Sequence, residues 1–220
     1  MFSSLSVLTF CLTFCLAIIT SLFVFILVNK YIFKYNQLKS QFVSLMVVLG
    51  SGGHTSEMMA LLKGLKIGSV NGKYSPISFV TANGDLLSQQ KAKQFTESLT
   101  DCQFLSITRS RSVGQSYWTS IVTTIISLFE SFYMIWKVRP QLIICNGPAI
   151  CYPICLSAKL ISKVMSTEVK IVFIESFCRT ESLSLTGKLV YHSGLYDHFL
   201  VQWPQLSHQY TNTQFIGLLV

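Results

Sequence analysis

The stretch VVLGSGGHTSEM, from Val47 to Met58, decides the fold prediction for this chain. In it an apolar run of strand length ends in a glycine turn, and a helix-forming segment follows at once. Several backbone N–H groups and a helix N-terminus would then meet at one point, a geometry that receives a phosphate or diphosphate. The spacing matches neither the dinucleotide-binding GxGxxG pattern nor a P-loop, which disfavours NAD and Walker-type ATP binding.

Within this loop, Gly52 and Gly53 permit a close backbone approach to a ligand. His54 would lie at the rim, where its imidazole can contact a phosphate or act as a base. A tight turn without a ligand is the alternative. The glycines alone leave the two interpretations about even, and the adjacent histidine favours a functional loop. The helix would be capped by Thr55 or Ser56, with Glu57 in its first turn.

Apolar runs of strand length alternate with helix-like segments along the rest of the chain. This alternation indicates an α/β protein with a single Rossmann-like, doubly wound parallel sheet that is covered on both faces. The expected strands are Ser44–Gly50, Ile77–Ala82, Gln103–Thr108, Gln141–Gly147, Lys170–Ser176 and His198–Trp203. The expected helices are Thr55–Lys66, Leu87–Leu99, Tyr117–Lys137 and Ile150–Met165.

The segment before this sheet is apolar and carries no charge from Met1 to Asn29. Its apolar part, Leu5–Val28, would span about 36 Å as a helix, enough to cross a bilayer core with some tilt. A signal peptide is the alternative, but no basic residue precedes the run and the run is too long for one. We therefore expect a retained, single-pass transmembrane helix in residues 1–29.

Charge distribution predicts the orientation of this anchor. Lys30, Lys34 and Lys39 follow it and no basic residue precedes it, so the positive-inside rule places the remainder in the cytosol. We expect a basic neck over residues 30–43 and one domain over residues 44–220. The net charge of +8 favours anionic headgroups and diphosphates as partners. Nucleic acid is disfavoured because the basic residues form no dense stripe.

The seven cysteines indicate reduced thiols. Their number is odd, they form no CxxC pair, and Cys11 and Cys15 fall inside the apolar segment. The four histidines lack zinc-like spacing, so we expect neither a metal nor a cofactor.

The segment Tyr117–Lys137 is a second long apolar run with one charge, Glu130. A second membrane span is one interpretation. Thr, Ser and Glu interrupt the run, and a sheet-covering helix is needed at this place. We therefore favour a helix that packs on the sheet or lies at a membrane surface.

Several distinctive loops fall after the predicted strands, where parallel sheets bind their ligands. In ESFCRTESLS, Glu175, Arg179 and Glu181 offer a carboxylate and an anion clamp, although an arginine paired with its neighbours is the commoner outcome. Asn146 and Gly147 of NGPA can bind a sugar or simply form a turn. Arg109 and Arg111 can contact a diphosphate, although two exposed arginines on a loop are as often simply solvated. Trp203 can belong to the core or stack against a sugar.

Taken together, GSGGHT, NGP, ESFCRTESLS and VQWP resemble the membrane-anchoring subunits of the two-part UDP-N-acetylglucosamine transferase of the dolichol-linked oligosaccharide pathway. The resemblance runs from about Val47 to Val220. It implies the N-terminal, acceptor-binding half of a GT-B glycosyltransferase, with a separate soluble subunit as the donor-binding half. The length of 220 residues agrees, because it leaves room for one such domain.

The implied reaction transfers GlcNAc from UDP-GlcNAc to GlcNAc-diphospho-dolichol on the cytosolic face of the endoplasmic reticulum. By motif, the resemblance implies catalytic roles for His54 and Glu175. It implies acceptor or diphosphate contacts from Gly52, Gly53, Thr55, Asn146, Gly147, Arg109, Arg179 and Glu181, and docking of the partner on Gly217, Leu218, Leu219 and Val220. A scaffold that only recruits a complete enzyme, and a peripheral lipid-phosphate binding protein, remain alternatives.

Overall fold

The computed structural model describes residues 4–39, 41–65, 67, 72–97, 99, 101–111 and 114–219. The predicted helix end Lys66 and the predicted docking residue Val220 lie outside the described residues. The chain divides into two compact units, Met1–Ser40 with Ser162–Thr167, and Gln41–Ile161 with Glu168–Val220. The first consists mainly of one helix, and the second contains the sheet and the candidate site.

Helix α1 (Ser4–Lys39) dominates the first unit. Its large apolar side chains are exposed around the helix, for example Leu12, Leu16 and Ile19 at 61–62%. A helix that is apolar all round needs an apolar solvent or a covering partner. By length and composition, Cys11–Ile32 can cross a membrane, and so can Trp118–Val138. The helix continues to Lys39, so most of the segment predicted as a neck is helical.

The second unit is built on one seven-stranded sheet in the order β3-β2-β1-β4-β5-β6-β7, with every neighbouring pair parallel. The predicted fold class is confirmed. The strands are β1 (Val43–Val48), β2 (Tyr74–Ala82), β3 (Cys102–Ile107), β4 (Leu142–Cys145), β5 (Lys170–Ile174), β6 (His198–Val201) and β7 (Gln214–Phe215). The helices after α1 are α2 (Gly53–Gly64), α3 (Leu86–Phe95), α4 (Tyr117–Val138), α5 (Cys151–Met165), α6 (Leu185–His192) and α7 (Pro204–Gln209).

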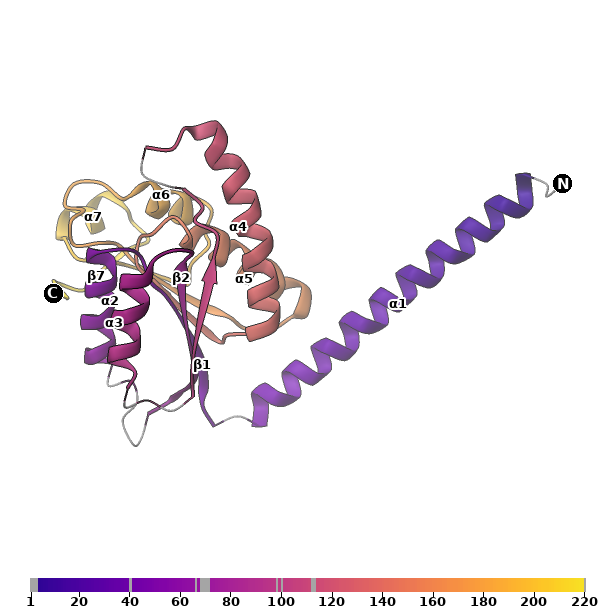
Figure 1. The fold of residues 1–220 in the computed structure, drawn as a ribbon, viewed down its shortest axis with the longest axis horizontal. Coiled ribbons are helices and arrows are strands. Elements are labelled where there is room, and N and C mark those ends of the chain that lie inside the picture. Colours follow the sequence, from indigo (N-terminus) through magenta and orange to yellow (C-terminus); the bar gives the residue numbers. More distant parts are fainter. Residues whose placement is uncertain are drawn as a thin grey trace. The chain divides into compact units, whose positions relative to one another are not determined.

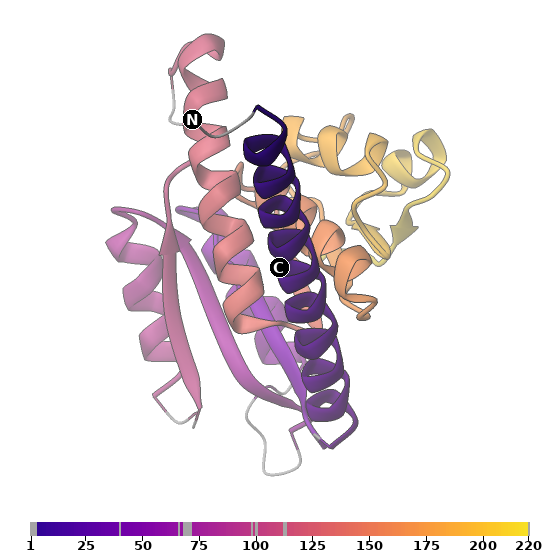
Figure 2. The same ribbon diagram turned by 90° about the vertical axis from the view of Figure 1, so that its right-hand side faces the viewer.

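Helices cover both faces of the sheet, with α2 and α3 on one side and α4 and α5 on the other (Figures 1 and 2). The central strand β1 is therefore sealed from water on both faces, and its residues from Leu45 to Val48 are fully buried. This explains its continuous apolar sequence, which an alternating strand with one solvated face would not need. On the α2 side, Met58 and Leu62 pack with Leu45 and Val47 in the core.

The order in which successive strands join the sheet reverses between β1 and β4, which are paired through Val48 and Cys145 at their carboxyl ends. After β1 the chain proceeds to β2 and β3, and after β4 it proceeds in the opposite direction to β5, β6 and β7. The loops after β1 and β4 lie close together at this switch point, where a Cβ on Gly50 would be 3.0 Å from Pro148, and they line a cavity of about 250 Å³. In open α/β sheets this switch point is where ligands bind.

Two helices, α6 and α7, were not predicted from the sequence. Their local signals are present, because Ser184 caps α6 by accepting from the Gly187 N–H and Pro204 occupies the first turn of α7. Both are short, and α6 lies between the predicted strands Lys170–Ser176 and His198–Trp203, in a stretch to which the sequence assigned no element. The short strand β7 was not predicted either.

Candidate functional site

The loop from β1 into α2 presents an open helix N-terminus. Gly52 is the N-cap residue, with a φ of 65°, and no side chain caps the first N–H groups. The prediction that Thr55 or Ser56 caps this helix is wrong, because α2 already begins at Gly53. The uncapped N–H groups and the helix dipole are thus available for an anion, as the sequence pattern predicts.

His54 stands at the opening of this helix and is oriented by Asn146, which follows β4. Its Nδ1 lies 3.0 Å from the Oδ1 of Asn146, and the Asn146 Nδ2 donates to the Oε2 of Glu57 at 3.1 Å. Because an amide oxygen only accepts, the His54 Nδ1 must carry the hydrogen. In the neutral ring, Nε2 is then left with a lone pair, as a general base requires.

Glu57 is the residue that joins the elements of the site, and it is only 3% exposed. Besides Asn146, it accepts a hydrogen bond from the Phe177 N–H at 2.7 Å and from the Ser176 hydroxyl at 3.3 Å. Its Oε2 lies 3.5 Å from the His54 Nδ1. One carboxylate thereby fixes the loops after β4 and β5 to helix α2.

The charges in this cluster shift one another's pKa. The hydrogen bond and charge of Glu57, and the bond to Asn146, raise the pKa of His54 against the opposing effect of burial. Burial by itself would raise the pKa of Glu57, but the bonds from His54, the Phe177 N–H and Asn146 outweigh it and hold that pKa below its usual range. His54 therefore binds its proton up to a higher pH than an isolated histidine does.

Glu175, predicted as catalytic, is fully buried at the end of β5. Its carboxylate accepts from the Ser184 N–H at 3.0 Å, from the Ser184 hydroxyl at 3.1 Å and from the Ser176 N–H at 3.1 Å. Burial raises the pKa of Glu175, and the bonds from Ser184 and Ser176 offset part of that rise. The side chain closes the loop from Glu175 to Ser184 into a rigid turn, and this geometry favours a positioning role.

A cavity of about 610 Å³ opens in front of His54. It brings together groups from the loops after β1, β3, β4 and β5, and its cationic side chains are Arg111 and Arg179. Gly53, Gly147 and Glu175, three of the residues for which a site role was predicted, also line it. Arg109 instead lines a neighbouring cavity of about 250 Å³ together with His54 and Asp85.

The family model described as "Oligosaccharide biosynthesis protein Alg14 like" matches residues 45–219. The chain belongs to the Alg14 family. Curated relatives are named UDP-N-acetylglucosamine transferase subunit ALG14. That of Rattus norvegicus is 40% identical over 189 residues, which are 82% of this chain and 84% of the relative. That of Yarrowia lipolytica is 37% identical over 203 residues, 90% and 91% of the two chains. The resemblance inferred from the motifs is confirmed.

Solved structures show the same fold. A UDP-N-acetylglucosamine 2-epimerase matches with a TM-score of 0.55 at 13% identity, over 77% of this chain and 44% of that one. MurG of Acinetobacter baumannii matches with a TM-score of 0.52 at 13% identity, over 73% and 41%. Both are of the GT-B type, and this Alg14-family chain spans less than half the length of each. The predicted GT-B half-fold is thus confirmed.

The residues that line the larger cavity of this Alg14-family protein do not include the predicted contact residues Gly52, Thr55, Arg109, Asn146 and Glu181. Thr55 is fully buried and its hydroxyl contacts the Gly50 carbonyl and, at 2.7 Å, the Ser88 hydroxyl, so it supports the loop from beneath. Glu181 is exposed and is not among the residues that line the cavity. Sequence reasoning also missed Glu57 as a site residue, although its position three residues after His54 places both on one face of α2.

The tail residues, predicted to dock a partner, differ in exposure. Leu218 is 58% exposed, whereas Leu219 packs against the domain's own core and its N–H donates to the Gln202 Oε1 at 3.0 Å. Gly217 precedes both leucines and has a φ of 78°, a conformation that favours glycine. Gln202 in turn donates to the Glu175 carbonyl at 3.1 Å, and its Nε2 lies 3.5 Å from the Glu57 Oε1. The tail is therefore connected to the site.

Proposed function

We propose that this chain is the acceptor-binding subunit of a two-part transferase that moves GlcNAc from UDP-GlcNAc to GlcNAc-diphospho-dolichol. The observation that carries the proposal is the His54–Asn146–Glu57 network beside an uncapped helix N-terminus at the switch point of the sheet. A donor-binding partner would supply the second half of the GT-B enzyme. The relatives named as transferase subunits support this division, because a subunit implies a partner.

His54 is assigned the role of general base. Its Nε2 takes the proton from the acceptor hydroxyl while that oxygen attacks the anomeric carbon of the donor GlcNAc, and the bond from this carbon to UDP breaks. Glu57 stabilises the imidazolium that results, and Asn146 holds the ring in the required tautomer. Glu175 is assigned to positioning, because its carboxylate is occupied by Ser176 and Ser184.

The acceptor diphosphate is assigned to the loop after β1. The first N–H groups of α2, beginning at Gly53, offer donors without intrahelical partners, and the helix dipole favours an anion there. Arg111 and Arg179 line the same cavity and add positive charge. No metal or cofactor is assigned, and among the residues that the structure describes no three ligand-type side chains gather for a metal ion.

We assign α1 as the anchor in the membrane of the endoplasmic reticulum. Its length and its apolar surface on all sides support a span, and Lys34 and Lys39, which follow the span Cys11–Ile32, support a cytosolic position for the domain. A GlcNAc acceptor carried on a membrane lipid requires an enzyme held at that surface, and the anchor meets this requirement.

The division of labour is tested with a transfer assay that uses UDP-GlcNAc and a short-chain lipid diphosphate carrying GlcNAc. The full chain alone and the partner alone should each give no transfer, and the co-purified complex should be active. If the partner alone were as active toward this acceptor as the complex, the chain would be a scaffold. A complex without activity would contradict the proposed reaction.

Replacing Leu218 with Asp should release the partner. Leu218 is an exposed apolar side chain in the tail, so a charge there opposes burial against another protein without disturbing the domain's own core. We expect at least a tenfold weaker association, measured as the partner retained on membranes that contain the full chain. Leu87→Asp on α3, at a residue 72% exposed, is the matched control and should retain the partner. Equal retention by both variants would contradict tail docking.

Replacing Glu57 with Gln should move the acidic limb of the pH–activity profile to lower pH. His54 must be neutral to accept a proton, so activity falls as the pH drops through its pKa, and Glu57 raises that pKa. Removing the negative charge lowers the His54 pKa and extends activity to more acidic conditions, whatever happens to the maximal rate. The exposed Glu97→Gln is the control, and a limb that stays in place would rule out this tuning.

Gly147→Ala tests the close contact between the loop after β4 and the histidine. A Cβ at this residue would lie 2.9 Å from the His54 Cε1, and the φ of 71° disfavours any side chain. Gly194 has a similar φ of 61° with open space around it, so Gly194→Ala is a control for the backbone effect alone. Both variants should lose about 1 kcal/mol of stability, but Gly147→Ala alone should lower kcat/KM, by at least tenfold. Equal activities would contradict the contact.

A further inference from the structure

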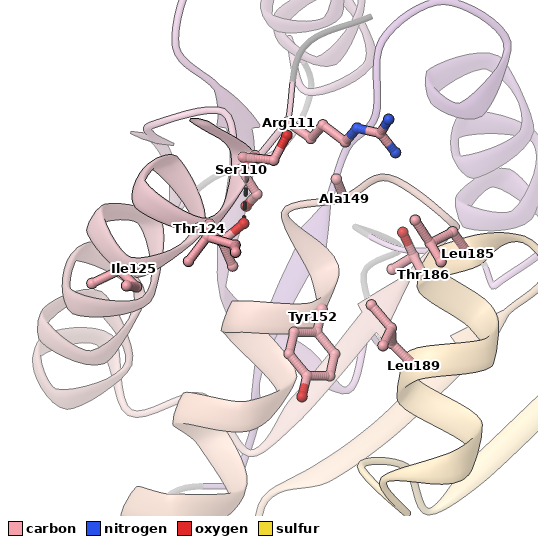
Figure 3. Close-up of a pocket in the computed structure, with 11 residues that line it drawn as sticks. Ser110, Arg111, Thr124, Ile125, Ala149, Tyr152, Leu185, Thr186 and Leu189 are labelled. Carbon is pink, nitrogen blue, oxygen red and sulfur yellow. Dashed lines mark hydrogen bonds between the residues drawn. The ribbon is translucent and has the colours of Figure 1, made fainter. Parts of the chain in front are cut away.

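An apolar groove of about 300 Å³ lies beside the cavity in front of His54. Figure 3 shows residues that line it, with Thr124 and Ile125 on α4, Tyr152 on α5 and Leu189 on α6. Ile121 and Leu185 complete its apolar lining. The groove is open, since Ile125 and Leu189 remain 48% and 44% exposed. Its volume is at the lower end of the range for small-ligand sites.

The groove and the cavity in front of His54 are continuous. Arg111, Ala149, Leu185 and Thr186 line both of them. A ligand that extends across this boundary would have a charged part beside Arg111 and Arg179 and an apolar part between α4 and α6. That combination fits an amphiphile whose anionic group is joined directly to a hydrocarbon chain. A nucleotide or a sugar alone has no part suited to the groove.

The exposed side of α4, the helix that forms one wall of the groove, is also apolar. Three of its buried positions hold serines (Ser120, Ser127 and Ser131) and two hold Met134 and Ile135, whereas Trp118 is 83% exposed and Phe129 is 73% exposed. Glu130 accepts from the hydroxyl of Thr108 at 2.8 Å and joins the helix to the end of β3. This pattern reverses that of a surface helix in water, which exposes polar residues. Beyond the groove, a long hydrocarbon chain would therefore meet more apolar surface.

We propose that the groove binds the isoprenoid units next to the diphosphate of the lipid-linked acceptor. The inference rests on the proposed function, which places the diphosphate in the adjoining cavity. The rest of the chain would leave along the exposed side of α4. Apolar burial of the first isoprenoid units adds affinity for the acceptor and fixes the direction in which the lipid enters, so that its sugar end reaches His54.

Two acceptors distinguish this subsite from the site itself, both measured with the full chain and its partner in detergent. One carries GlcNAc-diphosphate on a ten-carbon isoprenoid chain, and the other carries it on a methyl group. The unchanged complex should use both, with a lower KM for the isoprenoid acceptor. Ile125→Asp and Leu189→Asp should each raise the KM for the isoprenoid acceptor about tenfold and leave the methyl acceptor unaffected.

Val122→Asp is the matched control, because Val122 is 58% exposed on the same helix but does not line the groove. It should leave both KM values unchanged. An effect of Val122→Asp equal to that of Ile125→Asp would show a general contact of α4 with detergent or membrane and overturn the subsite. Equal KM increases for both acceptors in the groove variants would also overturn it. A complex that used neither acceptor would contradict the proposed function instead.

Discussion

Replacing His54 with Ala should lower kcat of the assembled transferase by about 10²–10⁴-fold, the usual contribution of a general base. Asn146 holds the imidazole and Glu57 raises its pKa. The ring lines the cavity of about 610 Å³. Truncation removes the proton acceptor but leaves the helix N-terminus and the arginines that are assigned to the diphosphate. The KM for the lipid acceptor should therefore change much less than kcat, as steady-state kinetics in detergent would show.

His198→Ala is the matched control for this variant. His198 is an exposed histidine at the start of β6. Because all seven strands run parallel, it lies at the amino ends of the strands, whereas the site lies at their carboxyl ends. It should keep its full rate. If His54→Ala retained more than about a tenth of the rate, when removal of a general base costs about 100-fold or more, a water molecule or a group of the partner would have to act as the base.

Replacing Glu57 with Ala should cost about 3–5 kcal/mol of stability, the usual result of removing one partner from a buried charged network. The Phe177 N–H, the Asn146 amide and the Ser176 hydroxyl would all lose their acceptor at once, at a carboxylate that is only 3% exposed. Thermal unfolding of the full chain in detergent should show a correspondingly large decrease in Tm.

Two further variants serve as controls for the loss of stability expected of Glu57→Ala. Glu97→Ala removes a carboxylate from an exposed position near the end of α3 and should change stability by less than about 0.5 kcal/mol. Glu57→Gln keeps the shape and part of the hydrogen bonding, so its loss should be smaller than that of Glu57→Ala. A Glu57→Ala chain as stable as the control would show that the donors find other partners and that Glu57 does not hold the loops.

Most of the fold could be predicted from the sequence because a doubly covered parallel sheet leaves a strong local signal. The run from Leu45 to Val48 is apolar at every position, and the structure shows why, since both faces of β1 are buried. The glycine loop after β1 and the Asn146 loop after β4 were predicted for the same reason, because both follow such runs. Helix α6 was missed, since eight residues beginning at Leu185 give little periodicity.

The connections within the site could not be predicted, because they join residues that are far apart in the chain. Glu57 and Phe177 are separated by 120 positions, and Glu57 and Gln202 by 145. The sequence predicted Glu57 in the first turn of a helix beginning near Thr55, where an acidic residue is normally solvated and favours the dipole. The structure begins α2 at Gly53 and places Glu57 after the first turn. Only in the folded chain does Glu57 contact the loops after β4 and β5, where its charge acts on His54. The burial of Thr55 could not be predicted either, because its hydroxyl contacts Ser88, which is 33 positions away in the chain.

Gln202 uses both ends of one carboxamide, the oxygen for the Leu219 N–H and the nitrogen toward Glu175 and Glu57. Its side-chain amide resonances in an NMR spectrum of isotopically labelled protein should therefore respond to two separate events, displacement of the tail and a change of charge around His54. A titration of partner and acceptor, each with and without the other, would then reveal from a single side chain whether the two binding equilibria are linked.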